Sequence, residues 1–185
     1  KSDWHKIVQR PAFDYKQLET KVASVLEDVR LNGDSAIKKY TKLFDGVSLD
    51  ELTVTRKEIA EAVANIDADL KAAIEMARNN ITRFHQAQKE PVVKMETVNG
   101  VLCWRRAVAI EKVGLYIPGG SAPLFSTLLM LGIPALLAGC KEIIVCSPPQ
   151  KDGKVNAYLA YCAELLEIDR IYLAGGAQAV AAIAY

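Results

Sequence analysis

The charge-free run over residues 113–140 constrains the fold of this chain more than any other feature. It reads VGLYIPGGSAPLFSTLLMLGIPALLAGC, 28 positions without an Asp, Glu, Lys, Arg or His. The charged residues lie elsewhere, since residues 1–112 hold 36 of the 45 and the last 73 residues hold nine. Such a run lies either in lipid or at the buried centre of a domain.

Glycines and prolines inside the run distinguish these two alternatives. A membrane-spanning helix needs about 20 consecutive apolar residues. This run is interrupted at six positions: Pro118, Gly119, Gly120, Pro123, Gly132 and Pro134. The pattern therefore predicts no membrane span, but a strand over 113–117, a Gly/Pro turn, and a helix over 124–131 that restarts after Pro134.

Composition narrows the class of protein. A chain of 185 residues suits one domain, or one and part of a second. The net charge of +1, without a basic stripe, argues against a nucleic-acid partner. No signal-peptide pattern opens the chain, so we expect a cytoplasmic protein. The four cysteines show no C-x-x-C spacing, and three lie in apolar strand or helix patterns, so we expect buried thiols and no disulfides.

Helical spacing dominates the first third of the chain. A helix is predicted over 17–30, with one apolar face and an end at Asn32-Gly33. Asp34-Ser35 is predicted to cap a short helix over 36–44. The apolar face of the first helix consists of Leu18, Val22, Val25 and Val29.

A capping motif, a long helix and a hairpin follow. A brief strand over 52–55 is predicted to lead into a helix capped by Thr55, with Glu58 as its capping-box partner. A longer helix is expected over 67–88, and the two β-rich runs that flank Asn99-Gly100 predict a hairpin. The predicted apolar face of the long helix consists of Leu70, Ala73, Ala77, Ile81 and Phe84.

From residue 113 onward, strands alternate with helices. We expect strands over 113–117, 142–147 and 170–175, joined by helices over 124–138 and 154–166 and followed by a helix from residue 177. The strands are almost entirely apolar, which is typical of a parallel sheet covered by helices on both faces.

The predicted fold class is therefore α/β: a helical N-terminal region with a β-hairpin, then the start of a Rossmann-like parallel βαβαβα unit. We divide the chain into an N-terminal arm (1–11), the helical part of a first α/β domain (12–112), and an incomplete Rossmann-like domain (113–185). Three strands make a narrow sheet, and the chain stops within AVAAIAY, without a C-cap or polar tail. We therefore expect a truncated sequence.

Two glycine-containing turns are the best candidates for a ligand site. They follow the first and third predicted strands, as Tyr116-Ile117-Pro118-Gly119-Gly120 and Ala174-Gly175-Gly176-Ala177-Gln178. In open α/β sheets, ligands bind where the carboxyl ends of strands turn into helices. Glycines let the backbone approach a ligand, and a helix N-terminus favours phosphate. Tyr116 and Gln178 are the side chains best placed to meet a nucleotide.

The glycines have a second interpretation, since they could simply make tight strand-to-helix turns. Neither turn matches the G-x-G-x-x-G or Walker A pattern. His5 and His85 are the only histidines and lack metal-ligand spacing, and neither Ser126 nor Thr127 has a visible base partner. The residues alone thus indicate a ligand cradle without a catalytic constellation.

The segment GLYIPGGSAPLFSTLLMLGIPALLAGCKEIIVCSPP (114–149) resembles the histidinol dehydrogenase family, the enzymes of the last two steps of histidine biosynthesis. The resemblance extends back through NNITRFHQAQKEP (79–91) and forward through LAGGAQAVAAIAY (173–185). The strings YIPGG, PLFST, AGCK and GGAQA fall in the family's order and spacing. The resemblance implies a histidinol dehydrogenase/aldehyde dehydrogenase-like fold, with two related, incomplete Rossmann-like domains, short swapped arms and a homodimeric assembly.

The same resemblance implies a reaction and its cofactors. Family members oxidise L-histidinol to L-histidine through L-histidinal in two NAD-dependent steps, with one zinc per active site. Carried onto this sequence, it implies that 113–185 is an NAD-binding domain, with NAD contacts from Tyr116 and Gln178 and with Pro118, Gly119 and Gly176 lining the same site.

The rest of the family's machinery has no counterpart here. Its zinc ligands (a Gln, two His and an Asp), its Glu–His acid/base pair and a further NAD-contacting Asn would lie beyond the point that matches Tyr185. We therefore expect no catalytic and no metal-binding residue in this chain. It resembles the amino-terminal two-fifths of such an enzyme, and we predict that it is inactive alone.

Two alternatives stay open at this point. The chain could belong to a related NAD-dependent dehydrogenase that oxidises another polar alcohol, because the discriminating residues would lie downstream. It could also be a non-catalytic nucleotide-binding or assembly module. The length of the parent reading frame distinguishes the second alternative from an enzyme.

Overall fold

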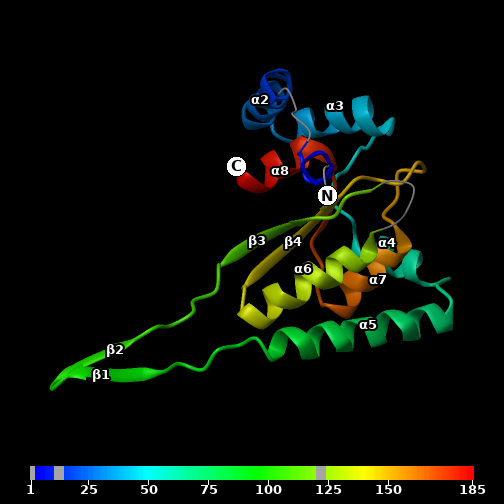
Figure 1. The fold of residues 1–185 in the computed structure, drawn as a ribbon. Helices are drawn as coiled ribbons and strands as arrows, with labels where there is room; N and C mark the ends of the chain where they lie inside the picture. The colour runs from blue at the N-terminus through cyan, green and yellow to red at the C-terminus, as the bar shows by residue number, and fades with distance from the viewer. Residues whose placement is uncertain (1–2, 11–14, 120–123) are drawn as a thin grey trace.

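The computed structural model describes residues 3–10, 15–119 and 124–185. Helices flank a short parallel sheet, and a hairpin extends away from them (Figure 1). In chain order the elements are α1 (Trp4–Ile7), α2 (Tyr15–Asn32), α3 (Asp34–Asp45), α4 (Arg56–Val63), α5 (Ala68–Gln86), β1 (Lys94–Val98), β2 (Val101–Trp104), β3 (Lys112–Tyr116), α6 (Phe125–Ala138), β4 (Glu142–Ser147), α7 (Ala157–Leu165), β5 (Ile171–Leu173) and α8 (Gly176–Ala184).

The central sheet has the order β3-β4-β5, with all neighbours parallel. In register, Tyr116 pairs with Cys146, and Cys146 pairs with Tyr172, so the three strands end at one edge of the sheet. This arrangement confirms the predicted parallel α/β unit. The predicted strand over 52–55 forms only an isolated antiparallel bridge, in which Thr53 pairs with Tyr172 at the outer edge of β5.

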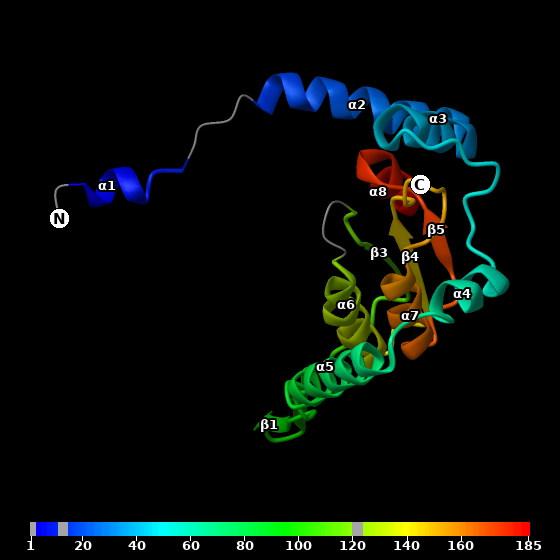
Figure 2. The ribbon, with the colours of Figure 1, turned by 90° about the vertical axis from the view of Figure 1, so that its right-hand side faces the viewer.

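Helices cover both faces of this sheet (Figures 1 and 2). One face carries α6 and α7, with α5 and α4 packed behind them, around a core that includes Leu128, Val145 and Ile171. The other face carries α8, with α2 and α3 packed on it. Gly114 lets α8 lie close to β3, because a Cβ at that position would lie 2.2 Å from Ile183 Cγ2.

The predicted capping box is confirmed. Thr55 Oγ1 accepts a hydrogen bond from the Glu58 backbone N–H (3.2 Å), and Glu58 Oε2 accepts one from the Thr55 backbone N–H (2.7 Å). The predicted cap of α3 at Asp34-Ser35 is wrong. Gly33, at φ 52°, is the N-cap, and Asp34 is already helical. Only one residue separates α2 from α3, so the turn requires a conformation that favours glycine.

The predicted interruption at Pro134 is also wrong, because α6 continues from Phe125 to Ala138 with Pro134 inside it. Proline removes one N–H donor from the helix. Three side chains around this point are buried: Leu128, Leu129 and Ile133. We attribute the continuity of α6 to this packing.

Two helices differ in detail from the pattern. On α5 the residue most buried is Ile74, whereas Ala73 and Phe84 of the predicted face are exposed. Helix α7 begins at Ala157, three residues after the predicted start, because Asn156 Oδ1 accepts hydrogen bonds from the backbone N–H groups of Tyr158 and Leu159. The start of α7 depends on this local cap, and the buried side of α5 depends on packing against α6; apolar spacing encodes neither.

The hairpin formed by β1 and β2 turns at Asn99-Gly100, as predicted, with Gly100 at φ 81°. All residues of both strands are exposed. Cys103 of β2 is therefore exposed, which corrects the expectation of burial, whereas Cys146 and Cys162 are buried as expected.

Helix α1 lies apart from the other helices in Figure 2, and its residues are exposed. Helices from before and after residue 112 share both cores. The division into an arm and two domains stays a prediction. Within the described ranges, no helix combines the length and the apolar character needed to cross a bilayer.

Candidate functional site

A cavity of about 1120 Å³ opens at the carboxyl edge of the sheet. Its wall includes Tyr116 at the end of β3, Leu173 at the end of β5, and Gly176 at the start of α8. The loop after β4, the start of α7 and part of α4 complete it. This is the position at which open α/β sheets bind ligands. The two turns predicted from the sequence thus meet at one cavity.

Tyr116 links the two turns directly. Its hydroxyl oxygen accepts a hydrogen bond from the Gly176 backbone N–H at 3.1 Å. The side chain of Tyr116 is half-buried and lines the cavity. One N–H at the start of α8 is therefore already bound by a side chain of the opposite turn.

The glycines of the two turns pack closely against Pro148 and Gln178. A Cβ at Gly119 would lie 2.4 Å from Pro148 Cγ, and one at Gly175 would lie 2.8 Å from Pro148 Cβ. Gly176 has φ 59°, and a Cβ there would lie 2.7 Å from Gln178 Oε1. Sequence reasoning identified these glycines but did not identify Pro148. The S-P-P string after β4 was the only available signal.

Gln178 lies deeper than expected. Its side chain is 0% exposed, and it does not line the cavity although Gly176 above it does. Both amide atoms, Oε1 and Nε2, are buried without a hydrogen-bond partner among the described residues. A buried polar group without a partner costs about 1–3 kcal/mol, so this amide is suited to receive one. The sequence predicts that Gln178 offers its amide to a ligand; in this structure the amide is closed off from the cavity.

Helix α3 contributes two further polar side chains that sequence reasoning missed. Thr41 Oγ1 and Asp45 Oδ2 are buried and unpaired among the described residues, and Asp45 lines the cavity. Burial raises the pKa of the Asp45 carboxyl above its usual range. These residues lie four positions apart on a helix that packs on α8, the helix of Gln178. Asp45 therefore brings a buried carboxylate oxygen without a partner among the described residues to the cavity.

The remaining predicted residues divide into two groups. Gly119 lines the cavity, whereas Pro118 is half-buried and does not. Gly120 lies outside the described residues. The structure therefore brings Tyr116, Gly119 and Gly176 together at the cavity. The buried side chain of Gln178 lies close to Gly176 but does not line the cavity.

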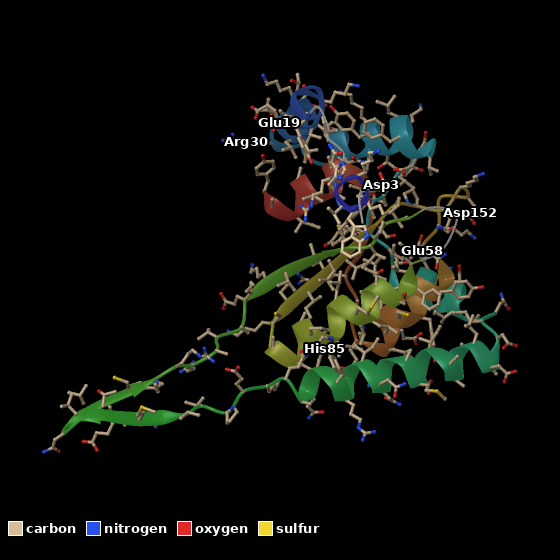
Figure 3. All side chains as sticks on the ribbon, viewed as in Figure 1. Asp3, Glu19, Arg30, Glu58, His85 and Asp152 are labelled. Atoms are coloured by element: carbon tan, nitrogen blue, oxygen red, sulfur yellow. The ribbon has the colours of Figure 1, made fainter. Side chains whose placement is uncertain are left out.

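Charged side chains also line the cavity. Glu58 and Asp152, labelled in Figure 3, lie there with Lys154. The Thr55 hydroxyl and backbone N–H, which bond to Glu58, hold the pKa of its carboxyl below the usual range. These groups are exposed to solvent, so they define the mouth of the cavity.

The histidines take no part in the cavity. His85 lies on α5, away from Glu58 and Asp152 in Figure 3, and its Nδ1 is 2.9 Å from Gln88 Oε1. His5 is exposed on α1. Over residues 3–10, 15–119 and 124–185, no group of three or more His, Cys, Asp or Glu side chains is placed to hold a metal ion. The site provides aromatic, backbone and amide groups for binding.

Three comparisons relate the chain to known proteins. The sequence profile described as Histidinol dehydrogenase matches residues 8–185. A histidinol dehydrogenase from Bacteroides fragilis is 49% identical over 185 residues, which is 100% of this chain and 43% of that protein. One from Vibrio vulnificus is 47% identical over 180 residues, which is 97% of this chain and 41% of that protein.

The crystal structure of histidinol dehydrogenase from Elizabethkingia anophelis superposes with a TM-score of 0.92 at 49% identity, covering 98% of this chain and 42% of that one. The chain thus spans about 43% of the length of the curated relatives it matches.

Proposed function

The chain belongs to the histidinol dehydrogenase family, and on this premise we propose that it forms the NAD-binding portion of an enzyme that oxidises L-histidinol to L-histidine. The reaction proceeds through L-histidinal and reduces two NAD. The observation that carries the NAD assignment is the meeting of two glycine turns at one cavity, joined by the hydrogen bond from Gly176 N–H to Tyr116 Oη.

The residues at this cavity fit a dinucleotide chemically. A primary amide such as that of Gln178 needs one donor and one acceptor side by side, and both the nicotinamide carboxamide and the adenine edge offer that pair. Tyr116 offers an aromatic face, and Asp45 an acceptor for a ribose hydroxyl. Gly119 and Gly176 line the cavity, and Pro118 is part of the first turn.

NAD supplies the hydride-transfer chemistry when bound. The role that we assign to this chain is to hold and orient the cofactor. Because the Gln178 side chain is fully buried, we expect its amide to reach NAD only after a local rearrangement that leaves the contacts of Gly119 and Gly175 with Pro148 in place.

Zinc and proton transfer are assigned elsewhere. The described residues hold no metal-binding group of the kind that zinc requires. We propose that the zinc ligands and the acid/base pair lie in parts of the parent protein outside these 185 residues, and that the chain alone does not oxidise L-histidinol. Turnover of L-histidinol with NAD by the isolated chain would contradict this proposal.

A homodimeric parent is also proposed. The hairpin formed by β1 and β2 extends from the body (Figure 1). Its apolar side chains are exposed, among them those of Met95, Leu102 and Trp104. A two-stranded hairpin is marginally stable alone. Burial against another part of the assembled protein would stabilise it.

Titration of the full-length protein with NAD tests the site. Tyr116→Ala and Gln178→Ala are each expected to raise the Kd for NAD by about tenfold or more, equivalent to the loss of one good polar or stacking contact. Gln86→Ala, at the exposed end of α5, is the control and is expected to leave the Kd unchanged. If neither Tyr116→Ala nor Gln178→Ala weakens binding, the NAD assignment is wrong.

A further inference from the structure

Pro148 lies between the two glycine turns. It follows the last residue of β4, Ser147, in the central strand of the sheet. Its ring contacts both turns, since a Cβ at Gly119 would lie 2.4 Å from Pro148 Cγ and one at Gly175 would lie 2.8 Å from Pro148 Cβ. No real Cβ tolerates such distances, so the turns pack on the proline as closely as glycine allows.

The backbone around Pro148 fixes the turns further. Beyond the end of β3, Ile117 N–H donates to Cys146 O (2.8 Å), and beyond the end of β5, Ala174 N–H donates to Ser147 O (2.9 Å). With the bond between Tyr116 and Gly176, both turns are attached to the end of β4 and to each other. Neither Gly119 nor Gly175 has a positive φ, so backbone conformation does not require glycine at these positions. Glycine is required there because the proline ring occupies the space that a Cβ would need.

We propose that Pro148 is a positioning residue for the dinucleotide site. Its ring sets the spacing of the turns after β3 and β5, so that Tyr116, Gly119 and Gly176 face one ligand before it binds. The inference rests on the proposed NAD function and goes beyond it, because Pro148 acts through the two turns. A preformed cradle binds more tightly, since little ordering remains when the ligand arrives.

Atom-specific contacts make the proposal testable in the full-length enzyme. Pro148→Ala removes Cγ and Cδ and keeps Cβ. It therefore removes the closest neighbour of an alanine at position 119, leaving Pro148 Cβ at 3.5 Å, which is an ordinary contact. It does not remove the closest neighbour of an alanine at position 175, which is Pro148 Cβ itself at 2.8 Å.

The experiment measures kcat and KM for NAD, with L-histidinol saturating, for wild type, Pro148→Ala, Gly119→Ala, Gly175→Ala and the two double variants that contain Pro148→Ala. Pro148→Ala alone is expected to raise KM for NAD about fivefold with little change in kcat. Gly119→Ala is expected to raise it about tenfold or more, and adding Pro148→Ala is expected to return it to the level of Pro148→Ala alone. Adding Pro148→Ala to Gly175→Ala is not expected to lower KM for NAD, because Cβ of residue 148 remains.

Gly132→Ala is the matched control. A Cβ at that position would lie 2.7 Å from Leu166 Cδ1, an equally close contact, but in α6 and away from the cavity. It is expected to lower Tm without changing KM for NAD. Pro148→Ala adds no heavy atoms and is expected to fold, so its kinetics test the proposal even if the glycine variants do not fold.

Failure of the positioning role and failure of the proposed function give different results. If wild type oxidises L-histidinol with NAD but Pro148→Ala leaves KM for NAD unchanged, or the effects of Gly119→Ala and Pro148→Ala are additive, the positioning role is wrong and the proposed function stands. If wild type neither binds NAD nor oxidises L-histidinol, the proposed function fails and the positioning role fails with it.

Discussion

At the scale of single residues, the hydroxyl of Tyr116 carries the connection between the two turns. Tyr116→Phe removes the acceptor of the Gly176 N–H but keeps the ring. We expect a loss of about 1 kcal/mol in the free energy of unfolding, which is typical of one hydrogen bond, together with weaker NAD binding. Urea unfolding and NAD titration of the full-length protein measure the two effects.

Tyr161→Phe is the control for that substitution. Tyr161 Oη donates a hydrogen bond to Glu75 Oε1 at 2.9 Å, which joins α7 to α5. Tyr161 does not line the cavity. Burial and this bond raise the pKa of Tyr161 to about 12, so the hydroxyl stays protonated at neutral pH. A similar loss of stability with unchanged NAD affinity is expected. Equal effects of both variants on NAD binding would contradict a specific role for Tyr116.

The cysteines allow a second prediction at this scale. Burial raises the pKa of the Cys146 thiol to about 11 and that of the Cys162 thiol to about 12, so neither forms the reactive thiolate at neutral pH. We expect a thiol reagent to modify Cys103 and Cys140 in the native protein and all four cysteines after denaturation. Rapid native labelling of Cys146 or Cys162, detected by mass spectrometry of peptides, would contradict the burial of that thiol.

Among the elements, α4 depends most clearly on its cap. Thr55→Ala is expected to lower the free energy of unfolding by about 1 kcal/mol at pH 7, because the Glu58 N–H loses its acceptor. The pKa of Glu58 is lower in the folded state than its usual value of 4.5, so its share of the stability is present above that value. It is lost as the pH falls through the lowered folded pKa.

The pH dependence can be measured by urea unfolding at pH 7 and pH 3. Glu58→Gln is expected to destabilise the protein at pH 7 and to differ less from wild type at pH 3, because protonation of the wild-type carboxyl increases as the pH falls. Lys57→Ala, on the same helix and exposed, is the control. A Glu58→Gln effect of equal size at both values would show that the charge of Glu58 does not stabilise α4.

The elements that the sequence predicts well are those specified by neighbouring residues. β4 was expected over 142–147 and is found at Glu142–Ser147, and the turn at Asn99-Gly100 and the capping box are also correct. The sequence does not predict features that depend on distant contacts. The continuity of α6 through Pro134 and the burial of Gln178 beneath its own turn both depend on packing.

The candidate site follows the same rule. Parallel strands bring their carboxyl ends to one edge, so the meeting of the turns of Tyr116 and Gly176 was predictable from the order of strands and helices. Pro148 was not, because its role exists only when β4 lies between β3 and β5. Asp45 reaches the cavity only because α3 packs on α8.

For the whole molecule, the two faces of the sheet and the hairpin differ in how their apolar groups are covered. Buried residues fill a core on each face. The hairpin instead leaves Met95 61% exposed and Leu102 52% exposed. Exposed apolar surface of this kind marks an interaction site, which for this chain is the proposed contact between copies of the full-length protein.

Charged substitutions on the hairpin test that contact. Register pairs Met95 with Cys103 and Leu102 with Glu96, so the two residues lie on opposite faces of the ribbon. Because a buried charge without a partner is strongly unfavourable, at least one of Met95→Glu and Leu102→Glu is expected to raise the Kd of the dimer by about tenfold or more. Met76→Glu, on the exposed side of α5, is expected to have no effect. Light scattering of the full-length protein across a dilution series measures the difference, and dimers of unchanged affinity in both hairpin variants would place the dimer interface elsewhere.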